Sequence, residues 1–344
     1  MSDVPHLRFP EFRGEWDIYE IGDVLCIGNG RDYKHLSKGD IPVFGTGGYM
    51  TSVNECLHEG ETTFIGRKGT INKPFYYNGK FWTVDTLFYT HSFKYVIPKF
   101  VYCLFQTINW LRYNEASGVP SLSKDTIEKI KVRIPQLDEQ KKIAKFLSLL
   151  DERIATQNKI IEKLQSLIKG IAHRVAGMGK PNVCLKECLE CTSSTLQESE
   201  VSDLGPYPVY GANGIVGFLD SYNTPDEAIY IVKDGSGVGS VVYVKGKCSA
   251  TGTLNILTAK QNYSLHFLYY LLKVFNYSPY KTGMAIPHIY FKDYGKSKIF
   301  CPPYAEQLQY AQLLVAIDTK LLAEKKILIS FNSQKQYLLR ELFI

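Results

Sequence analysis

Two long segments of the chain carry apolar residues at alternating intervals of four and three positions. The first follows Pro135, and its repeating positions are Ile143, Leu147, Leu150, Ile154, Gln157, Ile161, Leu164, Ile168, Ile171 and Val175. A narrow seam of this spacing, polar only at Gln157, predicts a coiled-coil helix. We expect Asp138 to be the N-cap of this helix and the stretch from Gly177 to Pro181 to end it.

The same seam returns near the end of the chain. Its positions are Tyr310, Leu314, Ile317, Leu321, Glu324, Leu328, Phe331, Lys335, Leu338 and Leu342. Glu324 stands where Gln157 stood in the first seam. Two such helices bury their seams by packing on each other, and if the halves are related by a pseudo-two-fold axis the helices run antiparallel. At about 1.5 Å per residue, each helix would be roughly 55 Å long.

The remainder of each half has a different pattern. It is rich in Gly, Tyr, Phe, Thr and Val, and short apolar runs such as 62–65 and 228–232 predict strands between turns. Short helices are expected at 100–110 and 265–274. The predicted fold is therefore α+β, with two pseudo-repeated globular domains joined by two long helices that form an antiparallel coiled coil. The expected boundaries are 1–135 and 179–302 for the domains, and 136–178 and 303–344 for the helices.

An internal duplication supports this division. The matching pairs, at an offset of about 167 residues, are 41–49 with 207–215, 65–69 with 231–235, 117–119 with 282–284, 124–125 with 292–293, and 135–140 with 302–307. Chance explains one such match but hardly five in the same order. The offset is the length of a domain rather than that of a solenoid repeat.

Composition excludes several classes of protein. The chain has 344 residues, enough for two or three domains, and 45% hydrophobic with 22% charged residues is typical of a globular protein. The longest apolar stretch, 267–275, is too short to span a bilayer. No signal peptide is indicated, and eight cysteines without one suggest reduced thiols in the cytoplasm. A net charge of +6 is compatible with nucleic acid as a partner without proving it.

Two similar domains at a fixed separation suit a target with two elements at a fixed separation, such as duplex DNA. The candidate contact residues lie on polar, glycine-containing turns. In the first domain they are Thr46, Gly47, Tyr49, Arg67, Lys68, Thr70, Ser117, Ser121, Ser123 and Lys124. In the second domain they are Tyr210, Asn213, Lys233, Asp234, Ser236, Thr282 and His288. Arg and Lys can donate to guanine edges or phosphates, and Asp can accept from cytosine N4. These segments could equally be ordinary turns, and both interpretations can hold together.

Three motifs resemble a methyltransferase motif, a phosphate-binding loop and a zinc site, but their details argue against each of these functions. Residues 301–304 (CPPY) resemble an amino-methyltransferase motif, but a cysteine at its first position accepts a hydrogen bond from an amine poorly, and the duplication places it at a helix start. The glycine run 235–239 lacks the Gly-Lys-Ser/Thr ending of a P-loop and fits a hairpin. Cys184, Cys188 and Cys191 have no fourth zinc ligand nearby, so we expect buried, apolar-type cysteines.

The order of motifs, taken with the duplication, resembles a known family over essentially the whole chain. The opening VPHLRFPEF (4–12) and the segment IPQLDEQKKI (134–143), which runs into a long helix containing Asp151, are similar to specificity subunits of type I restriction-modification systems. Ile317 and Asp318 recur at the matching place in the second half. The chain is short for the family, and CPPY stands where the first half has IPQL.

This resemblance implies a concrete function. Each globular domain would recognise one half of a bipartite sequence in double-stranded DNA, with a few unread bases between the halves. The paired helices would set that gap and dock two methyltransferase subunits, which recruit the restriction subunits. The chain itself would need no cofactor or metal and would not be catalytic. The alternative is a coiled-coil adaptor whose end domains bind proteins or glycans, and salt-dependent binding of DNA would separate the two hypotheses.

Overall fold

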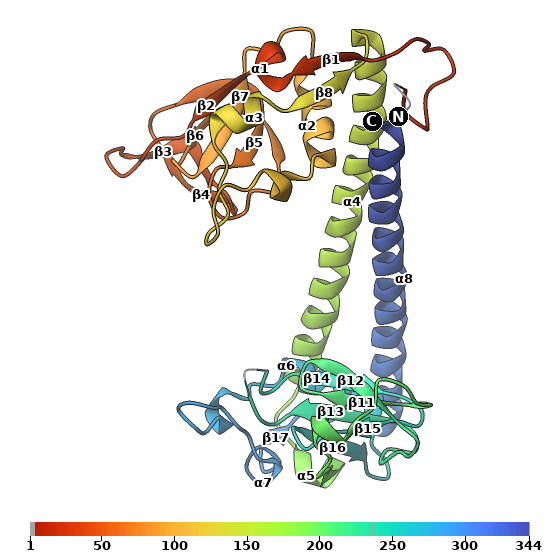
Figure 1. The fold of residues 1–344 in the computed structure, drawn as a ribbon. Coiled ribbons are helices and arrows are strands. Elements are labelled where there is room, and N and C mark those ends of the chain that lie inside the picture. The colour runs from red at the N-terminus through yellow and green to blue at the C-terminus, as the bar shows by residue number, and fades with distance from the viewer. Residues whose placement is uncertain (1–3, 236, 344) are drawn as a thin grey trace. The chain divides into compact units, whose positions relative to one another are not determined.

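The chain folds into two compact units, which the computed structural model describes over residues 4–235 and 237–343 (Figure 1). Unit 1 contains the described residues up to Gln157 and from Ile327 onward, and unit 2 contains those from Asn158 to Lys326. Each unit therefore combines one globular domain with parts of both long helices. The sequence instead predicts four segments, two domains and two helices. Those domain boundaries remain a prediction.

The globular domain of unit 1 contains one six-stranded sheet and a two-stranded one. Its elements are β1 (Asp17–Glu20), α1 (Ile21–Val24), β2 (Cys26–Asn29), β3 (Lys38–Gly45), β4 (Gly48–Val53), β5 (His58–Gly66), β6 (Phe75–Thr83), β7 (Leu87–His91), α2 (Pro98–Thr107), the 3-10 helix η1 (Trp110–Tyr113), α3 (Lys124–Glu128) and β8 (Lys131–Ile134). The larger sheet has the order β2-β7-β5-β6-β3-β4, and β1 pairs with β8. Helix α4 (Leu137–Ala176) follows β8.

The globular domain of unit 2 repeats this plan with shorter strands. Its elements are β9 (Val183–Cys184), α5 (Leu185–Cys188), β10 (Leu189–Ser193), η2 (Glu198–Glu200), β11 (Tyr207–Gly211), β12 (Gly214–Leu219), β13 (Ala228–Val232), β14 (Val241–Val244), β15 (Ser249–Ala250), β16 (Leu254–Ala259), α6 (Leu265–Val274), η3 (Ser278–Tyr280), α7 (Phe291–Tyr294) and β17 (Lys298–Ile299). Helix α8 (Tyr304–Leu342) completes the chain.

The strand orders of the two domains correspond. β10-β16-β13-β14 in unit 2 matches β2-β7-β5-β6 in unit 1, and the pair β9 and β17 matches β1 and β8. A parallel pairing also recurs, between β3 and β6 at Val43 and Trp82, and between β11 and β15 at Val209 and Ser249. The duplication in the sequence is thus a duplication of the fold, as predicted.

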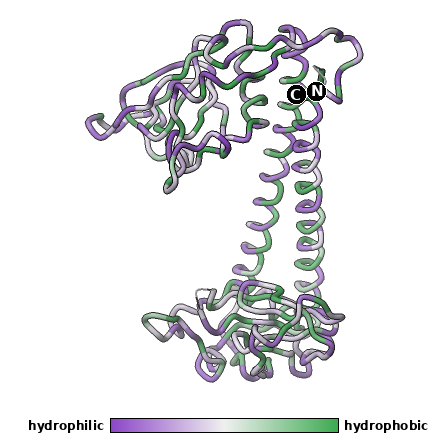
Figure 2. Tube along the Cα trace, in the orientation of Figure 1, coloured by the Kyte–Doolittle hydropathy of each residue, from purple (hydrophilic) through white to green (hydrophobic). Residues whose placement is uncertain are grey.

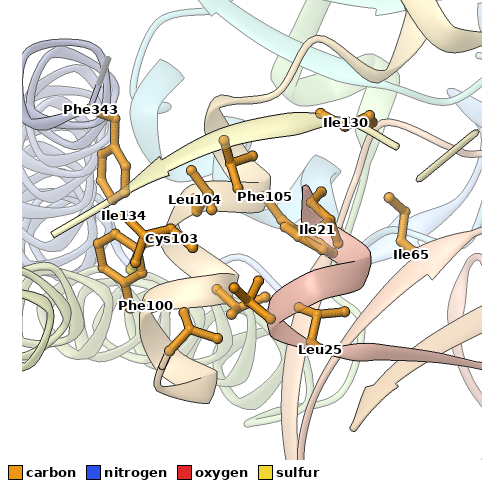
Figure 3. Close-up of a cluster of buried hydrophobic side chains, with 14 of the residues drawn as sticks. Ile21, Leu25, Ile65, Phe100, Cys103, Leu104, Phe105, Ile130, Ile134 and Phe343 are labelled. Carbon is orange, nitrogen blue, oxygen red and sulfur yellow. The ribbon is translucent and has the colours of Figure 1, made fainter. Parts of the chain in front are cut away.

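Apolar side chains from α1, α2 and β8 form the core of unit 1. Phe100 and Phe105 of α2 are fully buried, as is Ile21 of α1 (Figure 3). Phe343, just after α8, packs on Phe100 with ring centroids 5.4 Å apart. Helix α2 is amphipathic because its apolar residues recur at helical spacing, so one face is buried in the core, while Lys99, Tyr102 and Gln106 on the other face are half-buried. The helix ends at Thr107 rather than at 110, where η1 begins.

Unit 2 has the equivalent core. Phe267 and Leu272 of α6 are buried together with Leu185 and Cys188 of α5. All five residues of β13 are buried, which agrees with the continuous apolar run that predicted this strand. Cys188, the last residue of α5, occupies the place of Val24 at the end of α1, and it is fully buried among apolar residues, as expected of an apolar-type cysteine. Cys184 and Cys191 are only half-buried.

In each unit, a buried glutamine at the start of the long helix makes hydrogen bonds to the backbone of the globular domain. In unit 1 the Gln140 Oε1 accepts from the Ile97 N–H at 3.0 Å, while Nε2 donates to the Pro135 carbonyl at 2.8 Å and the Tyr95 carbonyl at 2.9 Å. In unit 2 the Gln307 Oε1 accepts from the Ser264 N–H at 2.9 Å, and Nε2 donates to the Pro302 carbonyl at 2.9 Å. These contacts explain why the final Gln of the repeated PQLDEQ and PPYAEQ motifs occurs at both helix starts.

The opening segment of the chain is anchored on the two helices within unit 1. The Arg8 guanidinium makes two 2.7 Å hydrogen bonds to the carboxylate of Glu139, which is 2% exposed, and this pairing raises the pKa of Arg8. The Leu7 N–H donates to the Glu341 carbonyl of α8 at 2.8 Å. A buried carboxylate needs such a partner because removing it from water is unfavourable.

The long helices pack antiparallel, as their seams predict. In unit 1 Ile143 and Leu147 of α4 share a core with Leu339 of α8, near the C-terminal end of that helix. In unit 2 Val175 of α4 shares a core with Ala311, near the beginning of α8. Every seam position of both helices is buried or half-buried, and Figure 2 shows hydrophobic positions recurring along each helix.

The polar seam positions have partners or contacts that make burial tolerable. Lys335 of α8 pairs with Asp151 of α4 at 2.6 Å inside unit 1. Glu324, 6% exposed, pairs with Lys320 one turn before it, also at 2.6 Å. Gln157 is buried to the same extent. Polar groups at seam positions are known to fix helix register at some expense of stability.

One detail of the helix start was predicted wrongly. Helix α4 begins at Leu137, so Asp138 lies inside the first turn and is not the N-cap. The Gln136 carbonyl accepts the first helical hydrogen bond, from the Gln140 N–H at 3.1 Å. The buried contacts of Gln140 set the position of this turn, and Asp138 instead pairs with Lys141 at 3.0 Å. The end at Ala176, just before Gly177, agrees with the prediction.

Candidate nucleic-acid interface

The predicted contact turn 67–70 of unit 1 is joined to a second predicted segment by a short ladder. Lys68 and Ser121 form an isolated antiparallel β-bridge. It is flanked by hydrogen bonds from the Gly69 N–H to the Pro120 carbonyl at 2.8 Å and from the Leu122 N–H to the Arg67 carbonyl at 2.9 Å. Arg67 and Lys68 are exposed. The structure therefore brings together two segments that the sequence separates by more than fifty residues.

The turn between β3 and β4 reaches the same cluster. The Thr86 carbonyl accepts from the Arg67 N–H at 2.7 Å, and the nearby Val84 N–H donates to the Phe44 carbonyl of β3 at 3.0 Å. A Cβ placed on Gly69 would lie 3.9 Å from the Thr46 hydroxyl oxygen. Gly47 and Tyr49 are exposed on this turn, whereas Thr46 and Thr70 are half-buried.

Loop 114–123 holds its own shape through two polar side chains. The Asn114 Oδ1 accepts from the Ala116 N–H at 3.1 Å and from the Ser121 N–H at 2.9 Å. The Glu115 carboxylate accepts from the hydroxyls of Thr126 and Ser123, the latter at 2.8 Å, and these bonds hold the pKa of Glu115 below its usual value. Ser117 lies exposed on the loop.

Two of the predicted residues at the end of this loop already have structural roles. Ser123 is the N-cap of α3, where its hydroxyl accepts from the Thr126 N–H at 3.1 Å. Lys124 pairs with Glu128 one turn later at 3.5 Å. Their side chains are half-buried and engaged, so Arg67, Lys68 and Ser117 are the more accessible members of the group.

Unit 2 has the same ladder with different side chains. Asp234 and His288 form the isolated bridge, flanked by the Gly235 N–H donating to the Pro287 carbonyl and the Ile289 N–H donating to the Lys233 carbonyl, both at 2.9 Å. The Lys233 N–H donates to the Thr253 carbonyl at 2.9 Å, as Arg67 does to Thr86 in unit 1. The framework is repeated in its hydrogen bonds, while Lys68 and Ser121 are replaced by Asp234 and His288.

The remaining predicted residues of unit 2 surround this ladder. The turn between β11 and β12 presents Asn213 to solvent, and Tyr210 is half-buried with its ring 5.7 Å from that of Tyr230. A Cβ placed on Gly237 would lie 3.9 Å from the Ala212 carbonyl, which places this turn beside the ladder. Thr282 exchanges two backbone hydrogen bonds with His288. Ser236 lies outside the described residues.

Several accessible residues beside these clusters were not predicted. Arg31 is exposed, and its N–H donates at 2.8 Å to the carbonyl of Thr83, the last residue of β6, three residues before the Thr86 that accepts from Arg67. The run Arg31-Asp32-Tyr33-Lys34-His35 could have indicated it by charge. In unit 2, Met284, Ile286 and Tyr290 are exposed between Thr282 and α7. Apolar residues give no signal of exposure in a sequence, so pattern alone could not have found them.

The motifs that suggested other chemistry have structural roles. Residues 301–304 lead into α8, and the Cys301 N–H donates to the Asn182 side chain at 2.9 Å. The glycine run 235–239 connects β13 and β14, which pair antiparallel as a hairpin. Burial raises the pKa of Cys191 to about 11, so this thiol is a poor metal ligand at neutral pH. Among the described residues no group of three or more His, Cys, Asp or Glu side chains could hold a metal ion.

The family model described as type I restriction modification DNA specificity domain matches residues 13–166 and again residues 180–330. The chain belongs to the family of type I restriction-modification specificity subunits. Both halves match the same model, which agrees with the duplicated fold and with the resemblance carried by the helix-start motifs.

Two relatives and one solved structure extend this finding. A putative type I restriction enzyme specificity subunit of Haemophilus influenzae is 22% identical over 333 residues, covering 87% of this chain and 86% of that protein. A type I restriction enzyme specificity subunit of Methanocaldococcus jannaschii is 33% identical over 206 residues, 52% of this chain and 45% of that protein. The crystal structure of the S subunit from M. genitalium covers 99% of both chains at a TM-score of 0.73 and 18% identity, which shows the fold of this specificity subunit.

Within the described part of this specificity subunit, no helix has the length and apolar character needed to cross a membrane.

Proposed function

We propose that this specificity subunit recognises a bipartite, gapped sequence in double-stranded DNA, with one target-recognition domain reading each half. The observation that carries the proposal is the repeated ladder with exchanged side chains. Arg67, Lys68 and Ser121 in the first domain correspond to Lys233, Asp234 and His288 in the second. A constant framework with different donors and acceptors is expected of two domains that read different bases, because base edges differ in their donor and acceptor pattern.

The paired helices α4 and α8 are proposed to set the number of unread bases. They have 40 and 39 residues, so each is about 60 Å long at about 1.5 Å per residue. Their buried seam makes them stiff. In DNA-binding dimers, half-site spacing follows the separation of the reading elements, and the same argument applies to two domains in one chain.

The helices are also the proposed dock for two methyltransferase subunits, through which restriction subunits join. Large apolar side chains are exposed outside the seam. On α4 they are Leu137, Phe146, Leu149, Ile160 and Leu167, and on α8 they are Tyr304, Leu308, Leu313, Leu322, Ile327, Ile329 and Tyr337. A helix that served only as a spacer would be expected to carry polar residues there. The specificity subunit would itself be non-catalytic and would act in the cytoplasm, where the DNA is.

The test is to co-express the chain with the methyltransferase subunit encoded beside it and to sequence the host DNA for modified bases. We expect a bipartite, gapped motif that is modified only when this chain is present. Binding of duplex DNA by the complex should also weaken steeply with salt, because phosphate contacts release counterions. No new modification by an active methyltransferase, together with salt-insensitive behaviour, would favour the adaptor hypothesis.

A further inference from the structure

One loop of the second target-recognition domain presents two large apolar side chains directly to solvent. Met284 is 105% exposed relative to its reference value and Ile286 is 66% exposed, in a loop that also contains the predicted residues Thr282 and His288. Exposed apolar side chains of this size are unfavourable in water unless a partner covers them. Both lie at the tip of one short loop, beside the ladder that carries Asp234.

The loop that carries these side chains has a defined conformation. Thr282 and His288 close it by two backbone hydrogen bonds, of 2.9 Å and 2.8 Å. Gly283 has φ +86°, and a Cβ added there would lie 2.3 Å from the Ile286 carbonyl oxygen, so only glycine fits the turn. The backbone hydrogen bonds between Thr282 and His288 therefore hold the tip of the loop in position. The bridge from His288 to Asp234 connects the loop to the segment that follows β13.

The surroundings of the tip favour a DNA groove as the partner. Lys281 and Lys292 are exposed at the two ends of the segment, and the Lys292 ammonium lies 5.0 Å from the centre of the exposed Tyr290 ring. His288 adds a hydrogen-bonding ring 5.1 Å from Tyr290. Cationic side chains on either side of an apolar tip match phosphates on either side of a groove.

On the major-groove edges of the bases, the apolar group available to such a tip is the thymine methyl. We propose that Met284 and Ile286 contact thymine methyl groups in the half-site bound by the second domain, which makes them specificity-determining residues. This inference rests on the proposed DNA-reading function. The first domain differs, since its equivalent loop carries Ser117, Gly118 and a single smaller apolar residue, Val119, which is 65% exposed.

The experiment replaces thymine by uracil, which lacks only the methyl group, within the identified target duplex. The dissociation constant of the complex with its methyltransferase partner is measured for duplexes substituted in one half-site at a time. The second half-site is the one whose modified motif relaxes in Asp234→Ala. We expect uracil there to weaken binding roughly fourfold for each contacted methyl, the effect of burying one such group.

The matched variant is the double substitution Met284→Ser and Ile286→Ser, which changes only exposed side chains. We expect it to bind the thymine duplex more weakly than the native chain and to bind thymine and uracil duplexes equally. Val119→Ser is the control, and it should leave the native response to uracil in the second half-site unchanged.

Three results would overturn the inference while leaving the proposed function intact. They are equal native binding of thymine and uracil duplexes, a second half-site without an A·T pair, and a double-serine variant that remains sensitive to uracil. An increase in fluorescence of 2-aminopurine placed in that half-site, without a methyl effect, would show insertion between bases and would also overturn it. Absence of any gapped motif would instead refute the proposed function.

Discussion

Asp234 faces His288 across a single antiparallel β-bridge in unit 2, at the place where Lys68 faces Ser121 in unit 1. The flanking hydrogen bonds are the same in both, with lengths between 2.8 and 2.9 Å. Backbone hydrogen bonds hold the framework, so the side chains at these four positions can change without altering the ladder. Each unit thereby offers a fixed support for exchangeable side chains.

Lys68→Ala is expected to affect only the half-site read by the first domain. Lys68 is exposed on the ladder, and its loss should weaken binding by about 1–3 kcal/mol if it contacts a base, or by a smaller and sequence-independent amount if it contacts phosphate. Sequencing of modified DNA and duplex binding measure the two effects separately. The control is Lys80→Ala, which removes an exposed lysine of β6 outside the ladder.

Relaxation of both half-sites by Lys68→Ala would contradict this assignment and indicate a folding defect of the chain. Unfolding by urea distinguishes that case, because an exposed lysine contributes little to stability.

Gly283→Ala is expected to weaken binding of the second half-site, because it changes the conformation of the loop closed by Thr282 and His288. The Cβ of an alanine here would lie 2.3 Å from the Ile286 carbonyl oxygen. The alanine would also have to adopt φ +86°, which costs about 1–3 kcal/mol of folding free energy. Duplex binding should weaken at the second half-site alone. Gly118→Ala is the matched control in the first domain, since a Cβ there meets nothing within 4 Å and φ is not positive. Equal effects of both substitutions on duplex binding would show that the loop conformation at Gly283 is unimportant for DNA binding.

Gln140→Leu and Gln307→Leu are expected to destabilise their own units. Gln140 is fully buried and Gln307 is 2% exposed, and each loss leaves one N–H and at least one buried carbonyl without a partner. Unsatisfied buried groups of this kind cost about 1–3 kcal/mol each. Urea unfolding measures the loss, with Gln136→Leu as the control because Gln136 is exposed. Comparable midpoints for Gln136→Leu and Gln140→Leu would show that the fastening bonds are dispensable.

Glu115 is expected to make the 114–126 region acid-sensitive. Hydrogen bonds from Thr126 and Ser123 lower the pKa of Glu115 in the folded chain. Its contribution to stability is therefore fully present above the unfolded-state pKa of about 4.3, and it is lost as pH falls through the lower pKa of the folded state. Protection of the Ser123 amide, which donates to this carboxylate at 3.2 Å, should therefore decline below about pH 4.3.

Glu115→Gln provides the comparison, since its amide does not titrate in this range. In this variant amide protection should be lower at neutral pH and, after correction for intrinsic exchange, independent of pH. An acid-induced decline of the same size in Glu115→Gln would assign the sensitivity to another group.

The features that the sequence predicts well are those that depend on local spacing. The seam from Ile143 to Val175 follows from intervals of four and three residues, and burial agrees at each position. The buried run of β13 is local in the same way. The N-cap at Asp138 was predicted wrongly because Gln140, through contacts with residues more than forty positions away, decides where the helix starts.

Pairings between distant segments could not be predicted. Lys68 and Ser121 were each proposed from their local chemistry, but only the sheet order places them opposite each other. The parallel pairing of Val43 with Trp82 depends on the same order. Met284 and Ile286 were missed because an apolar residue in a sequence suggests burial, and its exposure is decided by the loop frame.

A paired deletion in the helices tests the proposed ruler. Removing residues 156–162 from α4 and 323–329 from α8 takes out one heptad from each, near the division between the two units, and leaves the alternation of four and three intact. Each helix becomes about 10 Å shorter, which corresponds to about three base pairs at about 3.4 Å per pair. Sequencing of modified DNA should show two unchanged half-sites with a shorter gap between them.

The control deletes the same seven residues from α4 alone, which leaves the two seams unequal in length. This variant should lose stability and modification together, because its helices cannot bury both seams in register. A paired deletion that folds and supports modification with the original gap would contradict the ruler, since the separation of the reading domains would then be set by something other than helix length.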